Sequence, residues 1–415
     1  MANSILINSF FSGGAERQAA LLISKIKFDK VLTLENQKNF AVDFEDINPL
    51  SNHNQDTSSV YKTLFLPLYA KKLSPYIKPK DTVLSFMERA NFVNLIAKRN
   101  THHRVIIAER TQPSKEFTGI KALLIKPLIK KLYPKADMII ANSKGVKNDL
   151  IENFQIPEEK IKIIDNSYDI DAILEKTKET LTEGEEKIFN HSVMINVGRL
   201  TPQKGQKHLI RIFSKIKKSK KNLKLVFIGE GEIKGELINL AGQKKLKVFD
   251  IKAGTEINEN YDIYFLDFKE NTHKYVARAS LFVFTSIWEG FPNAIMETLI
   301  SGTPIICADC PSGPREILAP DTDFHKKTNM PEFAEYGILM PAFSNPDTQN
   351  SSLEDVWIAN IDHILSSPLT KEKYSNKGLQ RVKNLEIDKT IEKWQNLLQN
   401  IETKKTESNN HGDFA

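Results

Sequence analysis

The stretch from Phe284 to Pro304, FTSIWEGFPNAIMETLISGTP, decides how the second half of this chain folds. Its first residues continue an apolar run that is typical of a buried strand. Pro292 and Asn293 suit the first turn and the cap of a helix, and Gly302 followed by Pro304 suits its end. The stretch therefore predicts a short helix directly after a strand.

Two acidic residues, Glu289 and Glu297, lie eight positions apart, one before this helix and one inside it. A helix rises about 1.5 Å per residue, so we expect the carboxylates on the order of 12 Å apart or more. The acid and base of a sugar hydrolase stand roughly 5 to 9.5 Å apart, so the pair does not fit that chemistry. The spacing suits contacts at opposite ends of one long ligand, with the helix amides between them binding an anion such as a diphosphate.

Short apolar runs alternate with helical patterns along the whole chain, which predicts an α/β fold with parallel sheets covered by helices. Polar residues 165–187 are interpreted as the crossing between two domains. Ligands of doubly wound domains bind outside the carboxyl ends of the strands, so we expect a site in a cleft between the two sheets. The expected strands lie within 4–8, 30–34, 82–86, 104–108, 137–141, 160–164, 194–199, 223–229, 263–268, 281–286 and 303–309.

The chain of 415 residues, with 40 % hydrophobic and 27 % charged residues, is expected to form globular domains. No apolar run is long enough to predict a membrane-spanning helix, and the N-terminal residues lack the features of a signal peptide. Cys307 and Cys310 form a CADC motif that gives little support for a zinc site. A redox pair and two reduced residues at a strand end are both open, and a cytoplasmic protein is expected.

The net charge of +6 suggests an anionic partner. Residues 119–135 carry five lysines and no acid, with apolar residues at a spacing of four, and residues 61–80 have similar character. This pattern is typical of a helix that attaches to an anionic membrane surface, although Pro127 interrupts it. A core-facing helix with a solvated lysine face explains the pattern equally well. No recognised motif indicates a nucleic-acid partner.

Two pairs of residues follow predicted strands in the first half. Gly13 and Gly14 open a helix, where backbone amides can approach an anion or a sugar, although a tight turn alone also explains them. Glu109 and Arg110 are expected to face the cleft, with Glu109 on the acceptor side. A structural ion pair is the alternative interpretation.

In the second half, Arg199 and Lys204 flank a Thr-Pro turn just before a helix. Two cations that converge on a helix start make a clamp for a diphosphate. Charge-assisted hydrogen bonds of this kind contribute roughly 1.5–3 kcal/mol each. Together with the segment that carries Glu289 and Glu297, the two cations predict a site for a ligand with a diphosphate.

Four motifs, VGRLTPQKG, FIGEGE, HKYVARASLFVFTSIWEGFPNAIMETLISGTPII and CPSGPREIL, resemble in this order the second domain of family 4 glycosyltransferases. SGGAERQ near the N-terminus and the NSYDID link agree with that family, and the resemblance covers about residues 1–400. It implies a GT-B fold, in which two Rossmann-like doubly wound domains face a cleft and a C-terminal helix crosses back to the first domain. It also implies retaining transfer of a sugar from a nucleotide donor, with no required metal or other cofactor.

With this resemblance the expected domains are an N-terminal acceptor-binding domain at 1–168, completed by a helix at about 387–402, and a nucleotide-sugar-binding domain at 169–386. The polar tail 403–415 is predicted to be disordered. Arg199 and Lys204 would neutralise the leaving diphosphate as catalytic residues, together with Glu289, which would hold hydroxyls of the donor sugar. The implied donor-binding residues are Gly13, Gly14, Gly290, Phe291, Pro292, Asn293 and Glu297, the last of them on the ribose.

The AERTQP sequence around Glu109 and Arg110 resembles a subgroup with Ser-Glu-Arg where many members carry a histidine. That subgroup often builds bacterial surface glycans on lipid-linked acceptors with UDP-sugars. The resemblance therefore implies a UDP-linked rather than a GDP-linked donor, carrying a hexose or an N-acetylhexosamine. It also implies a glycan or polyprenyl-diphosphate-linked acceptor, and a protein peripheral on the inner face of the plasma membrane.

Three other classes of protein compete with this interpretation. A non-catalytic protein that kept the nucleotide-sugar site is the main alternative, a dehydrogenase is the second, and a phosphorylase or epimerase of similar shape is the third. A dehydrogenase would need a glycine fingerprint that GEGEIKG at 229–235 does not provide, and this segment is interpreted as a turn.

Overall fold

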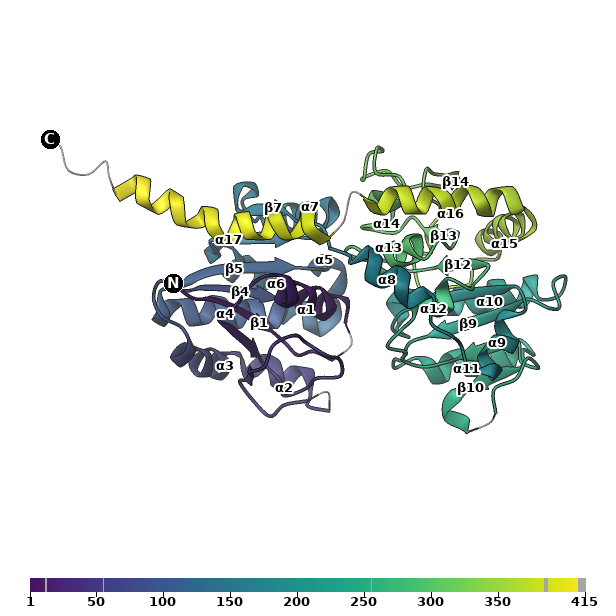
Figure 1. The fold of residues 1–415 in the computed structure, drawn as a ribbon, viewed down its shortest axis with the longest axis horizontal. Helices are drawn as coiled ribbons and strands as arrows, with labels where there is room; N and C mark the ends of the chain where they lie inside the picture. The colour runs from purple at the N-terminus through teal and green to yellow at the C-terminus, as the bar shows by residue number, and fades with distance from the viewer. Residues whose placement is uncertain (12, 55, 255, 384–386, 410–415) are drawn as a thin grey trace. The chain divides into compact units, whose positions relative to one another are not determined.

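The computed structural model describes residues 1–11, 13–54, 56–254, 256–383 and 387–409. The chain divides into two compact units, the first made of residues 1–167 and 387–415 and the second of residues 168–386. Each unit contains one sheet with helices on both of its faces (Figure 1).

Unit 1 is built on a seven-stranded parallel sheet with the order β3-β2-β1-β4-β5-β6-β7. Its strands are β1 (Asn3–Ile7), β2 (Lys30–Thr33), β3 (Ile47–Pro49), β4 (Thr82–Phe86), β5 (Arg104–Glu109), β6 (Met138–Ala141) and β7 (Ile161–Ile163). Its α-helices are α1 (Gly14–Lys25), α2 (Ser59–Leu64), α3 (Leu66–Leu73), α4 (Glu88–Thr101), α5 (Pro113–Glu116), α6 (Gly119–Leu132), α7 (Lys144–Phe154) and α17 (Ile387–Asn409).

Alternate side chains of each strand in unit 1 enter different cores, because successive residues of a strand point to opposite faces of the sheet. Leu6 and Val83 pack with the core that includes α3, α4, α6 and α7. Ile5 and Leu84 pack with the opposite core, to which α1 and α17 contribute. Both faces of the sheet are therefore covered, as a parallel sheet requires.

Helix α17 belongs to unit 1 although unit 2 precedes it in the chain (Figure 1). Ile391, Trp394 and Leu398 repeat at helical spacing and are buried, and the Trp394 ring centroid lies 6.0 Å from that of Phe86. The predicted return of a C-terminal helix to the first domain is confirmed. The tail predicted as disordered, 403–415, is helical through residue 409 because Glu and Lys are strong helix formers. Its last six residues lie outside the described part of the chain.

Unit 2 is built on an eight-stranded sheet with the order β10-β11-β9-β8-β12-β13-β15-β14, in which the edge strand β14 runs antiparallel to β15. Its strands are β8 (Val193–Val197), β9 (Lys224–Ile228), β10 (Val248–Asp250), β11 (Ile263–Phe265), β12 (Leu281–Phe284), β13 (Ile305–Ala308), β14 (Glu332–Phe333) and β15 (Ile338–Met340). Its α-helices are α8 (Ile170–Thr177), α9 (Glu183–Phe189), α10 (Gln206–Ile216), α11 (Lys234–Gln243), α12 (His273–Val276), α13 (Asn293–Ile300), α14 (Pro314–Leu318), α15 (Ser351–Ser366) and α16 (Pro368–Val382).

The polar stretch 165–187, interpreted as a crossing, is largely helical and contains α8 and the start of α9. Asp169 caps α8, and Thr182 with Glu185 forms a capping box at the start of α9. Its polarity follows from the exposure of these short helices. The two parallel-sheet units confirm the α/β doubly wound prediction.

Candidate active site

The site in unit 2 forms at the carboxyl edge of its sheet. Strands β9, β8, β12 and β13 are neighbours and run parallel, so the loops that follow them meet at one edge. These loops contain residues 229–231, 198–205, 285–292 and 309–313. The sequence-predicted residues of unit 2 lie in them or on the helix α13 that follows.

Lys204 and Glu289 form an ion pair in which Lys204 Nζ lies 2.6 Å from Glu289 Oε1. The lysine side chain is 17 % exposed and the glutamate side chain 7 %, so water screens the pair only weakly. Lys204 Nζ also lies 5.6 Å from the ring centroid of Phe284. The sequence predicted the two residues as separate contacts with a ligand, and the structure brings them together.

The backbone around Lys204 is fixed to the loop after β12. Gln203 accepts a hydrogen bond from the Ile287 amide through its carbonyl and donates one to the Trp288 carbonyl through its side chain, both at 2.8 Å. Gly205 has a φ of +65°, and a Cβ there would lie 2.2 Å from the Thr285 carbonyl oxygen. Glycine is therefore required for this close approach of the two loops.

A turn after β13 holds the backbone on both sides of Glu289. The Glu289 amide donates to the Pro311 carbonyl at 2.6 Å, and the Ser312 amide donates to the Glu289 carbonyl at 3.1 Å. The Ser312 hydroxyl donates to the Gly290 carbonyl at 2.9 Å. Gly313 has a φ of +90° and packs so close that a Cβ would lie 2.6 Å from Pro292 Cδ. The sequence analysis assigned no role to this turn.

Helix α13 begins next to the Lys204–Glu289 pair. Pro292 takes the cap position with extended backbone angles, and Asn293 is the first helical residue. The prediction that Asn293 caps the helix is wrong. Its side-chain oxygen instead accepts a hydrogen bond from the Tyr168 hydroxyl at 2.9 Å. Phe291 is buried in the core below the helix start. Gly302 ends the helix with a φ of +72°, as predicted.

Arg199 and Glu297 remain accessible to a ligand. Arg199 is exposed, and Glu297 is half-buried on α13. Within the described part of the chain, neither side chain makes a hydrogen bond or an ion pair. The backbone of Arg199 is held, because its carbonyl accepts a hydrogen bond from the Gln206 side chain at 2.9 Å.

Three polar side-chain atoms in the loops after β8 and β12 are buried without a hydrogen-bond partner among the described residues. They are the hydroxyls of Thr201 and Ser286 and the indole nitrogen of Trp288. Buried polar groups of native proteins are nearly always hydrogen-bonded, so such a group calls for an explanation. Their clustering in these loops is consistent with a polar ligand.

The segment GEGEIKG serves the packing of two loops. Gly229 has a φ of +137°, and a Cβ there would lie 2.1 Å from the Gly198 carbonyl oxygen. A Cβ on Gly231 would lie 2.2 Å from the Leu200 carbonyl oxygen. These glycines let the loops after β8 and β9 touch, which agrees with the interpretation of the segment as a turn.

In unit 1, Gly13 takes the cap position of α1 and Gly14 is its first residue. The Glu16 carboxylate lies over Gly13, where a Cβ would be 1.9 Å from Glu16 Oε2. The hydroxyl of Ser9 donates to Glu16 Oε1 at 3.4 Å. An acid at this helix start favours a hydroxyl-rich ligand over a phosphate, because like charges repel.

Glu109 is buried, with 1 % of its surface exposed. The Tyr133 hydroxyl donates to one carboxylate oxygen at 2.7 Å, and the Arg110 and Thr111 amides donate to the other at 3.0 and 3.3 Å. Burial, and after it the charge of Glu88, raise the pKa of Glu109 to about 7, although the hydrogen bonds that its carboxylate accepts act in the opposite direction. The structure thus places this carboxyl in the core rather than in the accessible position expected for it.

The Arg110 side chain packs against two aromatic rings of unit 1. Its guanidinium lies 4.7 Å from the ring centroid of Phe86 and 5.8 Å from that of Trp394, and it donates to the Asn166 side chain at 3.2 Å. Arg110 therefore helps to attach α17 to the sheet. These contacts explain its burial.

A charged cluster that the sequence analysis missed lies at the carboxyl ends of β2 and β4. Glu35 lies between two cations, with Lys62 Nζ at 2.8 Å and Arg89 Nη1 at 2.5 Å from its carboxylate oxygens. The Arg89 side chain keeps 17 % of its surface exposed. The cluster carries one net positive charge, which could not be predicted because its members lie far apart in the sequence.

The predicted basic helix, α6, is continuous across Pro127. Ile125 and Ile129 are buried in the core, whereas Leu123 and Leu124 are 75 % and 49 % exposed. A groove of about 620 Å³ lies along this helix, and among its lining residues are Lys126, Lys130 and Lys131. The inward face agrees with the interpretation as a core-facing helix, while attachment to a membrane through the exposed lysines and leucines stays a prediction.

The remaining candidates are buried. Cys307 and Cys310 are free and buried, and burial raises the pKa of both thiols.

Among the described residues, no three His, Cys, Asp or Glu side chains form a group that could hold a metal ion. No helix in the described part of the chain has the length and apolar character needed to cross a membrane.

The sequence matches two family models, Glycosyl transferases group 1 at residues 177–338 and Glycosyltransferase Family 4 at residues 58–172. The N-acetylgalactosamine-N,N'-diacetylbacillosaminyl-diphospho-undecaprenol 4-alpha-N-acetylgalactosaminyltransferase of Campylobacter jejuni is 32% identical over 387 residues, which cover 91% of this chain and 94% of that protein. An uncharacterized glycosyltransferase of Methanocaldococcus jannaschii is 32% identical over 79% of this chain and 81% of its own length. The chain therefore belongs to the family 4 glycosyltransferases.

Solved structures agree on the fold. HepE from Anabaena, in complex with UDP-glucose, has a TM-score of 0.70 at 15% identity and covers 96% of this chain and 100% of its own. A glycosyltransferase from Rickettsia africae has a TM-score of 0.66 at 16% identity, with 97% of this chain and 99% of its own covered. The two units have the GT-B fold.

Proposed function

We propose that this glycosyltransferase moves a hexose or N-acetylhexosamine, with retention of configuration, from a UDP-sugar to a glycan or lipid-linked acceptor. The product belongs to a bacterial cell-surface polysaccharide or glycolipid. The observation that carries the proposal is the Lys204–Glu289 pair beside the start of α13, with Arg199 exposed in the same set of loops. The names of the Campylobacter relative and of the HepE complex support the choice of acceptor and nucleotide.

In this proposal the donor diphosphate binds to Arg199, Lys204 and the amides at the start of α13, while Glu297 holds the ribose. Negative charge grows on the diphosphate as the bond to the sugar breaks, and cations that are already in place stabilise it best at that moment. Glu289 keeps Lys204 oriented and holds hydroxyls of the sugar. The acceptor hydroxyl then attacks from the face that the diphosphate leaves and gives its proton to the departing phosphate oxygen, with no metal required.

On the acceptor side we propose that the net positive cluster of Lys62 and Arg89 binds the anionic part of a lipid-linked acceptor. Gly13 and Gly14 line the junction between the donor and the acceptor, and Glu109 with Arg110 supports the acceptor side from within the core. The exposed leucines and lysines of α6 attach the protein to the inner face of the plasma membrane, with the protein itself cytoplasmic.

A panel of nucleotide-sugars tests the proposal through release of the nucleoside diphosphate, with and without a lipid-linked glycan. We expect release from a UDP-sugar that rises with the acceptor, and a product that keeps the anomeric configuration of the donor. The alternative function is a non-catalytic nucleotide-sugar-binding protein. Binding of UDP without release from any donor would support that alternative, and release without any dependence on an acceptor would contradict the transfer.

A further inference from the structure

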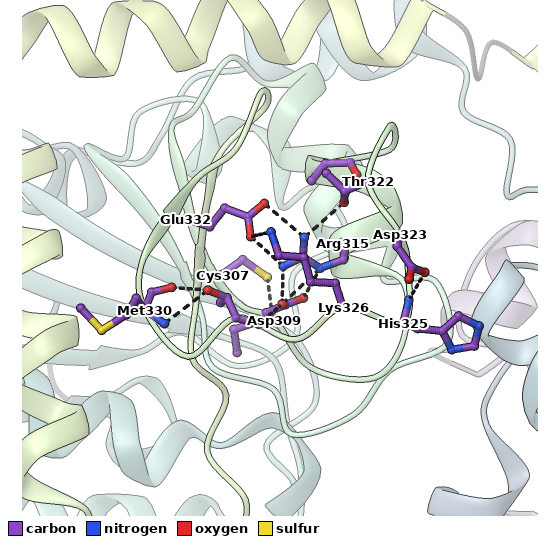
Figure 2. Close-up of polar contacts among 12 residues, drawn as sticks. Cys307, Asp309, Arg315, Thr322, Asp323, His325, Lys326, Met330 and Glu332 are labelled. Carbon is purple, nitrogen blue, oxygen red and sulfur yellow. Dashed lines mark hydrogen bonds and ion pairs between the residues drawn. The ribbon is translucent and has the colours of Figure 1, made fainter.

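Arg315 lies at the centre of a polar network beside the site (Figure 2). Its Nε donates to both oxygens of Asp309 at 3.2 Å, and its Nη2 donates to Asp309 Oδ2 at 2.5 Å and to Glu332 Oε2 at 3.0 Å. Its Nη1 donates to Thr322 Oγ1 at 3.2 Å and to Glu332 Oε1 at 3.1 Å. Every nitrogen of the guanidinium group is therefore partnered.

The network is buried at its centre. The side chain of Arg315 is 2 % exposed and that of Asp309 is fully buried, while Glu332 keeps 22 % of its side chain exposed. Lys326 Nζ lies 3.2 Å from Glu332, so two cations balance two acids. Burying charges in this way is costly and is weak evidence for added stability, so a structural role other than stability is worth seeking.

The position of the network along the chain suggests that role. Asp309 directly follows β13, and Arg315 lies on α14, so their ion pair joins the two ends of the turn at 310–313. This turn hydrogen-bonds the backbone on both sides of Glu289, through Pro311 and Ser312. The geometry of the turn therefore sets where the Glu289 carboxylate meets Lys204.

We propose that Arg315 is a positioning residue for Glu289. It closes the turn through Asp309, the turn fixes the Glu289 backbone, and Glu289 in turn orients Lys204 for the diphosphate. The role depends on the planar fork of arginine, because a lysine cannot bridge Asp309, Glu332 and Thr322 together. The inference rests on the proposed function, since it concerns the residues assigned there to the donor.

A double-mutant cycle on the full-length protein tests the inference. Arg315→Lys, Glu289→Gln and the double variant are titrated by calorimetry with UDP, GDP and ADP, and the dissociation constant of the tightest ligand is compared. We expect Arg315→Lys to weaken binding by about tenfold in the wild-type background and by less than about twofold in the Glu289→Gln background, because residues that act through one another are not additive. Arg278→Lys, an exposed arginine of the same unit, is the control and should change nothing.

Equal losses in both backgrounds would overturn the inference, because they would show that Arg315 acts independently of Glu289. If the wild type binds none of the three nucleotides, the proposed function fails and the inference fails with it. Equal losses with intact wild-type binding would overturn the inference alone, so the two failures are distinguishable. If Arg315→Lys does not fold, Glu332→Gln replaces it in the same cycle. That variant leaves the Asp309 pair intact, so we expect a smaller loss of about threefold that again disappears in the Glu289→Gln background.

Discussion

Glu109 of unit 1 and the acidic residues of the unit 2 site differ in the partners that surround them. In unit 1, Glu109 is enclosed in the core and donor groups surround its carboxylate. In unit 2, Glu289 is also buried but pairs with the cation of Lys204, and Glu297 stays half-exposed without a partner among the described residues. A polar residue after a parallel strand is therefore not by itself a ligand contact. What distinguishes unit 2 is the set of loops that holds the backbone of its acids.

The largest expected effect concerns the pH dependence of stability through Glu109. Its folded-state pKa of about 7 lies above the ordinary value of 4.5, so the folded state binds more protons between these pH values. The free energy of unfolding should therefore fall as the pH rises from about 4.5 to 7, on the order of 3 kcal/mol in total. Urea denaturation should show this fall in the wild type but not in Glu109→Gln. The control Glu152→Gln, at an exposed position on α7, should show the same fall as the wild type. A wild-type free energy of unfolding that does not change over this pH range would contradict the raised pKa of the buried Glu109 carboxyl.

The second effect concerns Lys204. Lys204→Ala should lower kcat by tenfold or more, which corresponds to about 1.4 kcal/mol upward in the barrier, while the fold survives. The loss arises because the variant keeps Glu289 but removes the cation that meets the diphosphate. Steady-state release of UDP measures the effect, with Lys221→Ala on the exposed surface of unit 2 as the control. An unchanged kcat would remove Lys204 from the mechanism and weaken the contrast between the units.

The third effect concerns Glu297. Glu297→Gln keeps the size of the side chain but loses the charge, so a hydrogen bond to a ribose hydroxyl should weaken. We expect UDP to bind about fivefold more weakly, or about 1 kcal/mol. Calorimetric titration measures this change, and the exposed Glu256→Gln should bind like the wild type. Unchanged affinity in Glu297→Gln would argue against the ribose contact.

The smallest effect per residue concerns α6. Each lysine near an anionic membrane contributes about 1 kcal/mol, so Lys130→Glu with Lys131→Glu should weaken co-sedimentation with anionic liposomes. Binding of the wild type should also fall as salt is raised. A variant with Lys221→Glu and Lys244→Glu has the same net charge but leaves α6 intact, and it should bind like the wild type. Absence of wild-type binding at low salt would refute the attachment.

Much of the fold could be predicted because its signals are local. Buried parallel strands such as β4 and β12 are short apolar runs, and α13 carries its own start and stop residues. The strands β3 and β10 were not predicted, because each has only three residues at or near a sheet edge. Helix α16 was not predicted for a different reason. Most of its residues are polar, so the few residues that it buries form no clear apolar pattern.

The site could be predicted where one segment contains both the functional residue and the signals for the element beside it, as with Glu289 and the helix after it. The Lys204–Glu289 pair joins residues 85 positions apart, and no local pattern specifies such a contact. The turn at 310–313 was visible only as a family motif, because its hydrogen bonds to Glu289 depend on the neighbouring positions of β12 and β13. The burial of Arg110 depends on Trp394, which comes from the far end of the chain.

The position of α17 also has a consequence for synthesis on the ribosome. The sheet of unit 1 is translated first, but the part of its face that receives Trp394 and Leu398 stays uncovered until α17 has been made. All strands and helices of unit 2 are translated before α17. Unit 2 can therefore complete its fold while unit 1 still lacks this helix. A nascent chain that stalls after residue 386 would therefore carry one finished half and one half with an exposed apolar surface that chaperones recognise.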